Sequence, residues 1–201
     1  MLLDAEDSQL VLVDYQAKLM PAIHEAELVL ANAVRLARIA QLLQVPVWAT
    51  EENPEGLGGT VDALQPLVAG RVLAKMAFDG SSVLLPRLKP APKAQGGNAR
   101  SLPKHLQKAA PAPAPGRETL VVAGCEAHVC LLQTALGLLE EELEVWVVTD
   151  ACGARSERSR DAAFDRLAGA GAELVTTEMV AFEWLRDAGH PRFGEVLALV
   201  K

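Results

Sequence analysis

Residues 119–139, TLVVAGCEAHVCLLQTALGLL, decide the fold of this chain. The apolar run at residues 120–123 has the character of a buried strand, Gly124 interrupts it, and from about Ala127 the apolar residues recur at helical spacing. The stretch therefore predicts a strand, a tight turn and a helix that carries Cys130 near its start. Unpaired N–H groups and the positive end of the helix dipole favour a thiolate there and can hold an oxyanion. Cys130 is thus a candidate nucleophile, although an arbitrary cysteine is more often a small core residue.

Further apolar runs on both sides of this stretch alternate with segments of helical periodicity. The loop signals between them include the polar and glycine-rich residues 51–59, EENPEGLGG. Strands that alternate with helices predict an α/β fold with a parallel sheet covered on both faces. The predicted strands are residues 8–13, 46–50, 72–74, 120–123, 144–149 and 173–176, and the other predicted helices are residues 26–43, 61–68, 158–168, 177–185 and 193–200.

The length of 201 residues and a hydrophobic content of 50% predict a single domain over residues 1–201. No apolar run approaches a membrane span, and the acidic start MLLDAED does not resemble a targeting peptide, so we expect a cytoplasmic protein with no membrane partner. The three cysteines, an odd number, favour reduced thiols over a disulfide framework. Neither they nor the four scattered histidines have the spacing of a metal site, and we expect no metal and no cofactor.

Residues 86–117 differ in composition from the rest of the chain. They contain seven prolines and seven lysines or arginines, no acidic residue and few large apolar residues, so they cannot bury enough surface to offset chain entropy. We predict a flexible basic insertion. Basic arms can bind phosphates, but this one has no aromatic residue and the remaining chain is strongly acidic, so we expect no nucleic-acid partner.

Three chemically different side chains follow the predicted strands. Asp14, Lys75 and Cys130 each lie at or just after a carboxyl end, where ligands bind in open parallel sheets. A thiolate can attack, a carboxylate can relay protons, and an ammonium can stabilise negative charge. Asp14 and Lys75 follow apolar runs, where an unpaired charge is costly, so we expect them to pair. No GxGxxG or Walker loop follows the first strand, so nucleotide chemistry is unsupported.

Five motifs lie at or near the predicted strand ends. They are LVDYQ at residues 12–16, VLAKMAF at 72–78, GCEAHVCLLQTAL at 124–136, VVTDA at 147–151 and GAELVTTE at 171–178. In these motifs the chain resembles the isochorismatase-like cysteine hydrolases. The resemblance implies a three-layer, Rossmann-like fold whose six-stranded parallel sheet has the order 3-2-1-4-5-6. The order reverses between the first and fourth strands, which carry Asp14 and Cys130.

The resemblance also implies a catalytic triad. Cys130 would be the nucleophile, Asp14 the general base, and Lys75 the cation that positions and stabilises the thiolate. A cis peptide bond that does not involve proline precedes the helix in this family and maps onto Cys125–Glu126. The backbone N–H groups of Glu126 and Cys130 would then form the oxyanion hole.

Departures from the family pattern narrow the expected subgroup. Residues 50–60 hold no histidine where nicotinamidases carry metal ligands, so the chain looks most like the metal-free isochorismatase-domain proteins. Asp79 replaces a usual serine, and Gly153-Ala-Arg155 replaces Ser-Ser-Arg. The candidate substrate-binding residues are Tyr15, Trp48, Phe78 and His128, of which His128 is expected to line the pocket or cap the helix rather than act as a base.

The expected function is that of a metal-independent cysteine hydrolase. It would act on a small-molecule substrate, on an amide or related C–N bond, through a covalent intermediate. Two alternatives stay open: a non-catalytic ligand-binding or assembly protein of the same fold, and an isochorismate-type vinyl-ether hydrolase. The resemblance further implies a homo-oligomer.

Overall fold

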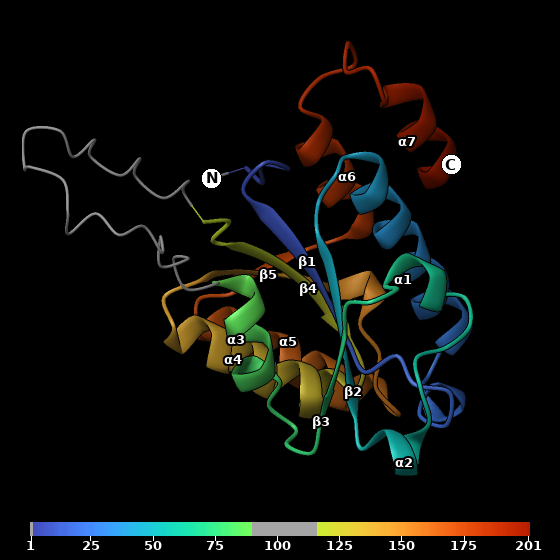
Figure 1. The fold of residues 1–201 in the computed structure, drawn as a ribbon, viewed down its shortest axis with the longest axis vertical. Coiled ribbons are helices and arrows are strands. Elements are labelled where there is room, and N and C mark those ends of the chain that lie inside the picture. The colour runs from blue at the N-terminus through green and yellow to red at the C-terminus, as the bar shows by residue number, and fades with distance from the viewer. Residues whose placement is uncertain (1, 90–115) are drawn as a thin grey trace, which may run out of the picture.

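The computed structural model describes residues 2–89 and 116–201, and within these ranges it contains a parallel sheet between two layers of helices (Figure 1). The strand order is β3-β2-β1-β4-β5-β6 and every neighbouring pair is parallel, which confirms the predicted α/β fold and order. The six strands are β1 (Ser8–Val13), β2 (Val47–Glu52), β3 (Val72–Lys75), β4 (Thr119–Gly124), β5 (Glu144–Val148) and β6 (Glu173–Val175).

Two groups of helices cover the two faces of the sheet (Figure 1). One group contains α1 (Ala26–Leu42), α6 (Thr177–Leu185) and α7 (Phe193–Val200), and the other contains α3 (Ser81–Leu88), α4 (Leu132–Glu140) and α5 (Glu157–Gly169). The shorter elements are α2 (Pro54–Leu57), the 3₁₀ turns η1 (Met20–Ala22), η2 (Gln65–Leu67) and η6 (Thr149–Ala151), and the π-helical turn η5 (Ala127–Leu131), which runs into α4.

The two central strands, β1 and β4, are buried along their whole length. Their near-continuous apolar sequences suit strands that are covered on both faces. They pair from Ser8 opposite Thr119 to Val13 opposite Gly124. A Cβ atom at Gly124 would lie 2.5 Å from the carbonyl oxygen of Val13, so only glycine fits where these two strands end. The polar residues of the site follow at this edge.

Two short segments differ from the sequence predictions. The stretch expected as loop contains α2, because Pro54 fits the first turn of a helix and the Asn53 side chain accepts a hydrogen bond from Gly56 N at 3.3 Å. Over residues 61–68 the sequence predicts a short helical piece interrupted at Pro66. The structure has the 3₁₀ turn Gln65–Leu67 there, and Pro66 lies within that turn rather than interrupting it.

The predicted start of the basic insertion at residue 86 is also wrong. Pro86 lies inside α3, which is held to the sheet by the buried side chains of Leu84 and Leu88. The composition placed the start of the insertion too early because a count of prolines and basic residues does not show that this helix has an apolar face. Residues 90–115 lie outside the described residues, and the prediction for them stays a prediction.

The two described ends of this segment are fastened at the amino end of the sheet. The Gln9 side-chain amide, near the start of β1, donates to the carbonyl oxygens of Leu88 at 3.2 Å and Arg117 at 3.0 Å. Arg117 also donates to the carbonyl oxygen of Ser8 at 2.8 Å. Asp14 follows the opposite, carboxyl end of β1. The residues that flank positions 90–115 therefore lie at the edge of the sheet away from Asp14.

No helix within residues 2–89 and 116–201 is long and apolar enough to cross a membrane.

Candidate active site

A buried ion pair lies at the carboxyl ends of β1 and β3. The Nζ atom of Lys75 is 2.7 Å from Oδ2 of Asp14, and the two side chains are 2% and 0% exposed. The Thr50 hydroxyl of β2 donates to the other carboxylate oxygen, Oδ1, at 2.7 Å. Asp14 ends its strand in the left-handed region, with φ of 54°, which aspartate tolerates better than most residues. The predicted pairing of Asp14 with Lys75 is present.

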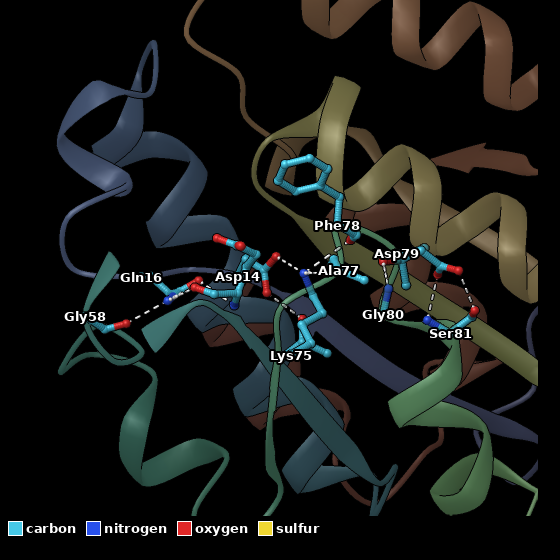
Figure 2. A network of polar contacts seen from close by, with 12 residues as sticks. Asp14, Gln16, Gly58, Lys75, Ala77, Phe78, Asp79, Gly80 and Ser81 are labelled. Carbon is cyan, nitrogen blue, oxygen red and sulfur yellow. Dashed lines mark hydrogen bonds and ion pairs between the residues drawn. The ribbon is translucent and has the colours of Figure 1, made fainter. Parts of the chain in front are cut away.

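Lys75 is held on three sides (Figure 2). Besides Asp14, its ammonium donates to the carbonyl oxygens of Ala77 at 3.1 Å and Phe78 at 3.2 Å. An ammonium has three N–H donors, so these three acceptors use all of them. The loop after β3 thus fixes the position of the Lys75 ammonium group.

Cys130 lies in η5 and is 7% exposed. All three cysteines are free, as the sequence predicts. Burial raises the pKa of the Cys130 thiol to about 12; the charge of Asp14 and a hydrogen bond to it add to the increase, whereas Lys75 opposes it. Burial and the nearby carboxylate thus act against the thiolate that the position at a helix start favours, whereas Lys75 acts for it.

The turn between β4 and η5 contains the predicted cis peptide bond, Cys125–Glu126. Ala127 N donates to the carbonyl oxygen of Gly153 at 2.7 Å, which ties the start of η5 to the chain after β5. The Glu126 carboxylate accepts from the backbone N and the Nε of Arg155, both at 3.0 Å. The segment 153–155, where the sequence departs from the family pattern, therefore supports the turn that leads to the candidate nucleophile.

Two of the predicted substrate-binding residues are not brought to this site. Tyr15 is 1% exposed and donates its hydroxyl to the carbonyl oxygen of Ala151, and burial raises its phenol pKa well above the usual value. Trp48 donates to Oε1 of Gln9 at 3.0 Å, and the Arg71 guanidinium lies 5.5 Å from the centre of its ring. Tyr15 is a core residue, and Trp48 belongs to the amino-terminal half of the sheet.

The other two predicted residues lie beside the catalytic candidates. Phe78 contributes its carbonyl oxygen to Lys75, while its ring is 51% exposed and projects away from the Lys75 side chain (Figure 2). His128 is half-buried in η5, two residues before Cys130, and within the described part of the chain its Nδ1 atom is buried without a hydrogen-bond partner. A role for either residue in substrate binding stays a prediction.

Sequence reasoning missed the residues that hold the pair in place. Thr50 contacts the pair directly, and the Gln16 side chain ties the chain after Asp14 to the end of β2: it donates to the carbonyl oxygen of Glu52 at 2.9 Å and accepts from Glu52 N at 2.8 Å. It also donates to the carbonyl oxygen of Gly58 at 2.6 Å (Figure 2). The signal available for Thr50 was its polar side chain at the end of the predicted strand 46–50; its place opposite Val13 comes from the register of the folded sheet. Within the two described ranges, no group of three or more His, Cys, Asp or Glu side chains is arranged to hold a metal ion.

The comparisons with known proteins agree with this architecture. The family model described as an isochorismatase domain matches residues 8–179. The chain belongs to the isochorismatase family. Isochorismatase domain-containing protein 2A of Mus musculus is 34% identical over 196 residues, which cover 98% of this chain and 84% of the mouse protein.

Solved structures of isochorismatase-like proteins share the fold over nearly the whole chain. One described as the MAR1 ribonuclease of Caenorhabditis elegans is 30% identical, with a TM-score of 0.83 and coverage of 100% of this chain and 92% of that one. The YcaC protein of Escherichia coli, described as an octameric hydrolase of unknown specificity, is 26% identical, with a TM-score of 0.79 and coverage of 99% and 90%. YcaC of Pseudomonas aeruginosa, solved with covalent acrylamide, is 26% identical, with a TM-score of 0.77 and coverage of 98% and 91%. The present chain thus has the fold of isochorismatase-family hydrolases.

Proposed function

We propose that this isochorismatase-domain protein is a metal-independent cysteine hydrolase that cleaves an amide or related C–N bond of a small molecule. The observation that supports it most strongly is the buried Asp14–Lys75 ion pair beside the thiol of Cys130. A buried ion pair is seldom the most stable way to fill a core, so its presence favours a chemical role. A carboxylate beside a thiol supplies a base for a nucleophile.

In the proposed reaction, the sulfur of Cys130 attacks the carbonyl carbon while its proton passes to Asp14. The C–N bond then breaks, Asp14 gives the proton to the leaving nitrogen, and a thioester remains on Cys130. A water molecule donates a proton to Asp14 and attacks the thioester. The acid is released as the sulfur takes the proton back. The positive charge of Lys75, whose Nζ atom is 2.7 Å from Oδ2 of Asp14, balances the negative charge as it moves from the carboxylate to the oxyanion and back.

The oxyanion formed in each attack needs hydrogen-bond donors close to the sulfur. The backbone N–H groups of Glu126 and Cys130 are the proposed donors. Glu126 immediately precedes η5, and its side chain is held by Arg155. This arrangement supports the proposal because a donor on a fixed backbone needs no reorganisation during the reaction.

Acrylamide is a suitable probe of this proposal, because it combines an amide with an electrophilic alkene and is bound covalently in the P. aeruginosa YcaC structure. Its β-carbon would form a bond with the sulfur of Cys130, and the thiol proton would end on the α-carbon. A thiol of pKa about 12 is ionised in only about one molecule in 10⁵ at pH 7, so a reaction through free thiolate would accelerate about tenfold per pH unit.

Transfer of the proton to Asp14 changes this pH dependence. The reacting state then holds as many protons as the resting state, so the rate of acrylamide addition to Cys130 should be nearly constant between pH 7 and 10. Cys125 and Cys152 provide internal controls, because burial raises the pKa of both thiols and both lie in the core. Their labelling should rise with pH. A tenfold rise per pH unit at Cys130 would contradict the role of Asp14 as base.

A screen of small amides would then test hydrolysis directly. The expected result is release of ammonia or amine by the wild-type protein and none by the Cys130→Ala variant. RNA belongs in the same screen, because the C. elegans neighbour is described as a ribonuclease. A protein whose Cys130 is unreactive toward acrylamide and that hydrolyses no amide would be better explained as a binding protein of the same fold.

The octameric E. coli neighbour supports a further part of the proposal, that this protein forms a homo-oligomer. Light scattering coupled to gel filtration would test it, and a mass of 21.4 kDa in solution would contradict it. The free thiols favour a reducing, cytoplasmic location, which cell fractionation would test.

A further inference from the structure

One hydrogen bond joins the loop that holds Lys75 to the helix that follows Cys130. Gly80 N, in the loop after β3, donates to the hydroxyl oxygen of Thr134 at 2.8 Å. Thr134 lies in α4 and is 0% exposed. No water can replace the hydroxyl there without a change in packing, so the loss of this bond would leave a buried N–H group unsatisfied.

The loop and the helix are also in close contact beside this bond. A Cβ atom at Gly80 would lie 3.2 Å from the Thr134 hydroxyl oxygen and 3.5 Å from the Cδ and Cε atoms of Lys75. One turn further along α4, a Cβ atom at Gly137 would lie 3.0 Å from both carboxylate oxygens of Asp79. Thr134 is therefore packed against the residues that enclose the Lys75 side chain.

Asp79 keeps this loop compact. Its carboxylate accepts from Ser81 N at 2.7 Å and from the Ser81 hydroxyl at 2.8 Å, a turn that begins α3 (Figure 2). Asp79, which stands where the isochorismatase-domain pattern usually has serine, therefore has a structural role in this loop. Two other loop residues, Ala77 and Phe78, direct their carbonyl oxygens at Lys75. Among residues 2–89 and 116–201, the bond from Gly80 N to Thr134 is the only hydrogen bond between the loop at residues 76–80 and η5 or α4, the helical segment that carries Cys130.

Thr134 stands four residues after Cys130, about one helical turn along the same face. We infer that Thr134 is a positioning residue, which sets the place of the Lys75 ammonium relative to the sulfur of Cys130 by fixing the loop at Gly80. This inference rests on the proposed function, in which Lys75 supports the reacting thiol. It adds to that function a hydroxyl that touches neither the substrate nor the reacting atoms.

The test compares the rate of acrylamide addition to Cys130 in three variants. Thr134→Val keeps the shape of the side chain but removes the hydroxyl, and it should slow the reaction by about tenfold, because the released loop no longer holds Lys75 in place. Thr134→Ser keeps the hydroxyl and should restore most of the rate. The matched control is Thr177→Val, which removes an equally buried hydroxyl, bonded to Asp150 at 3.0 Å, on the other helical layer and should leave the rate unchanged.

A double-mutant cycle separates positioning from a loss of stability. In a Lys75→Met background, Thr134→Val should have no further effect on the labelling rate, because the group that it positions is gone. The same tenfold loss in both backgrounds would overturn the inference, as would wild-type labelling by Thr134→Val. If Thr134→Val does not fold, Thr134→Ala removes the same hydroxyl without a branched replacement.

A crystal structure of the folded hydroxyl-free variant decides the question even if Cys130 proves unreactive. The inference expects Lys75 to lose at least one of its two carbonyl contacts in that structure. A Lys75 that keeps all three acceptors would overturn it. An unreactive Cys130 in the wild type would instead refute the proposed function, so the two failures are distinguishable.

Discussion

Replacement of Lys75 by methionine tests how much the buried ion pair matters for the fold. The variant keeps the length of the side chain but leaves the carboxylate of Asp14 without its counter-charge in a site where both side chains are at most 2% exposed. Loss of one partner from such a pair typically lowers the free energy of unfolding by about 3 to 5 kcal/mol. With a urea m-value of about 2 kcal/mol/M, the unfolding midpoint should fall by about 2 M. Tryptophan fluorescence at pH 7.5 would follow the transition, since the chain has three tryptophans.

Two further variants make this prediction refutable. Arg192→Met removes one partner of an ion pair with Glu195 that has the same 2.7 Å distance but is about half exposed, so it should cost at most about 1 kcal/mol. The double variant Asp14→Asn, Lys75→Met should lose less stability than Lys75→Met alone, because no uncompensated charge stays buried. Two results would refute this reasoning. In the first, Lys75→Met lowers the free energy of unfolding by no more than Arg192→Met does. In the second, the double variant loses as much stability as Asp14→Asn and Lys75→Met lose separately when added together.

Three more predictions follow from described contacts. Replacement of residues 90–115 by a short glycine-rich linker should leave the rate of acrylamide addition to Cys130 unchanged, since the flanking residues are fastened at the far edge of the sheet; a large loss of rate would contradict this. Gly153→Ala should lower stability by about 1 to 3 kcal/mol in a urea titration, because its Cβ would collide with a buried isoleucine, whereas Gly169→Ala, with no atom within 4 Å, should be neutral or slightly stabilising. Thr50→Val should lower stability by about 1 to 3 kcal/mol, because the buried carboxylate loses a donor, and a loss below about 0.5 kcal/mol would show that another donor replaces it.

Much of the fold could be predicted because strands in a doubly covered sheet are short apolar runs. The resemblance added the strand order, which periodicity does not supply. The failures came from short elements. Four-residue α2 depends on the cap at Asn53, and α3 depends on Leu84 and Leu88, which a proline-rich composition conceals. Local caps and a few buried contacts decide such segments, and neither leaves a periodic pattern long enough to recognise.

The pairing of two candidate site residues could be predicted from the sequence, but the surroundings of the third could not. Asp14 and Lys75 could be paired in advance because two buried charges of opposite sign need each other. The state of Cys130 depends on its burial and on its distance from the carboxylate, which only the folded chain provides. Trp48 was misplaced because an aromatic residue on a strand was considered without its register; its partner in β1 is Val11, three residues before Asp14.

The two hydrogen bonds from the Gln9 side chain to Leu88 and Arg117 bear on how the connection between these residues can vary in length. One amide group holds together the two chain ends that flank residues 90–115, so the distance between those ends does not depend on how many residues join them. The connection can therefore be lengthened, shortened or replaced without moving the strands that carry Asp14 and Lys75. The same position is suited to engineering: a reporter domain with neighbouring termini could be inserted there, at the edge of the sheet opposite to Asp14, Lys75 and Cys130.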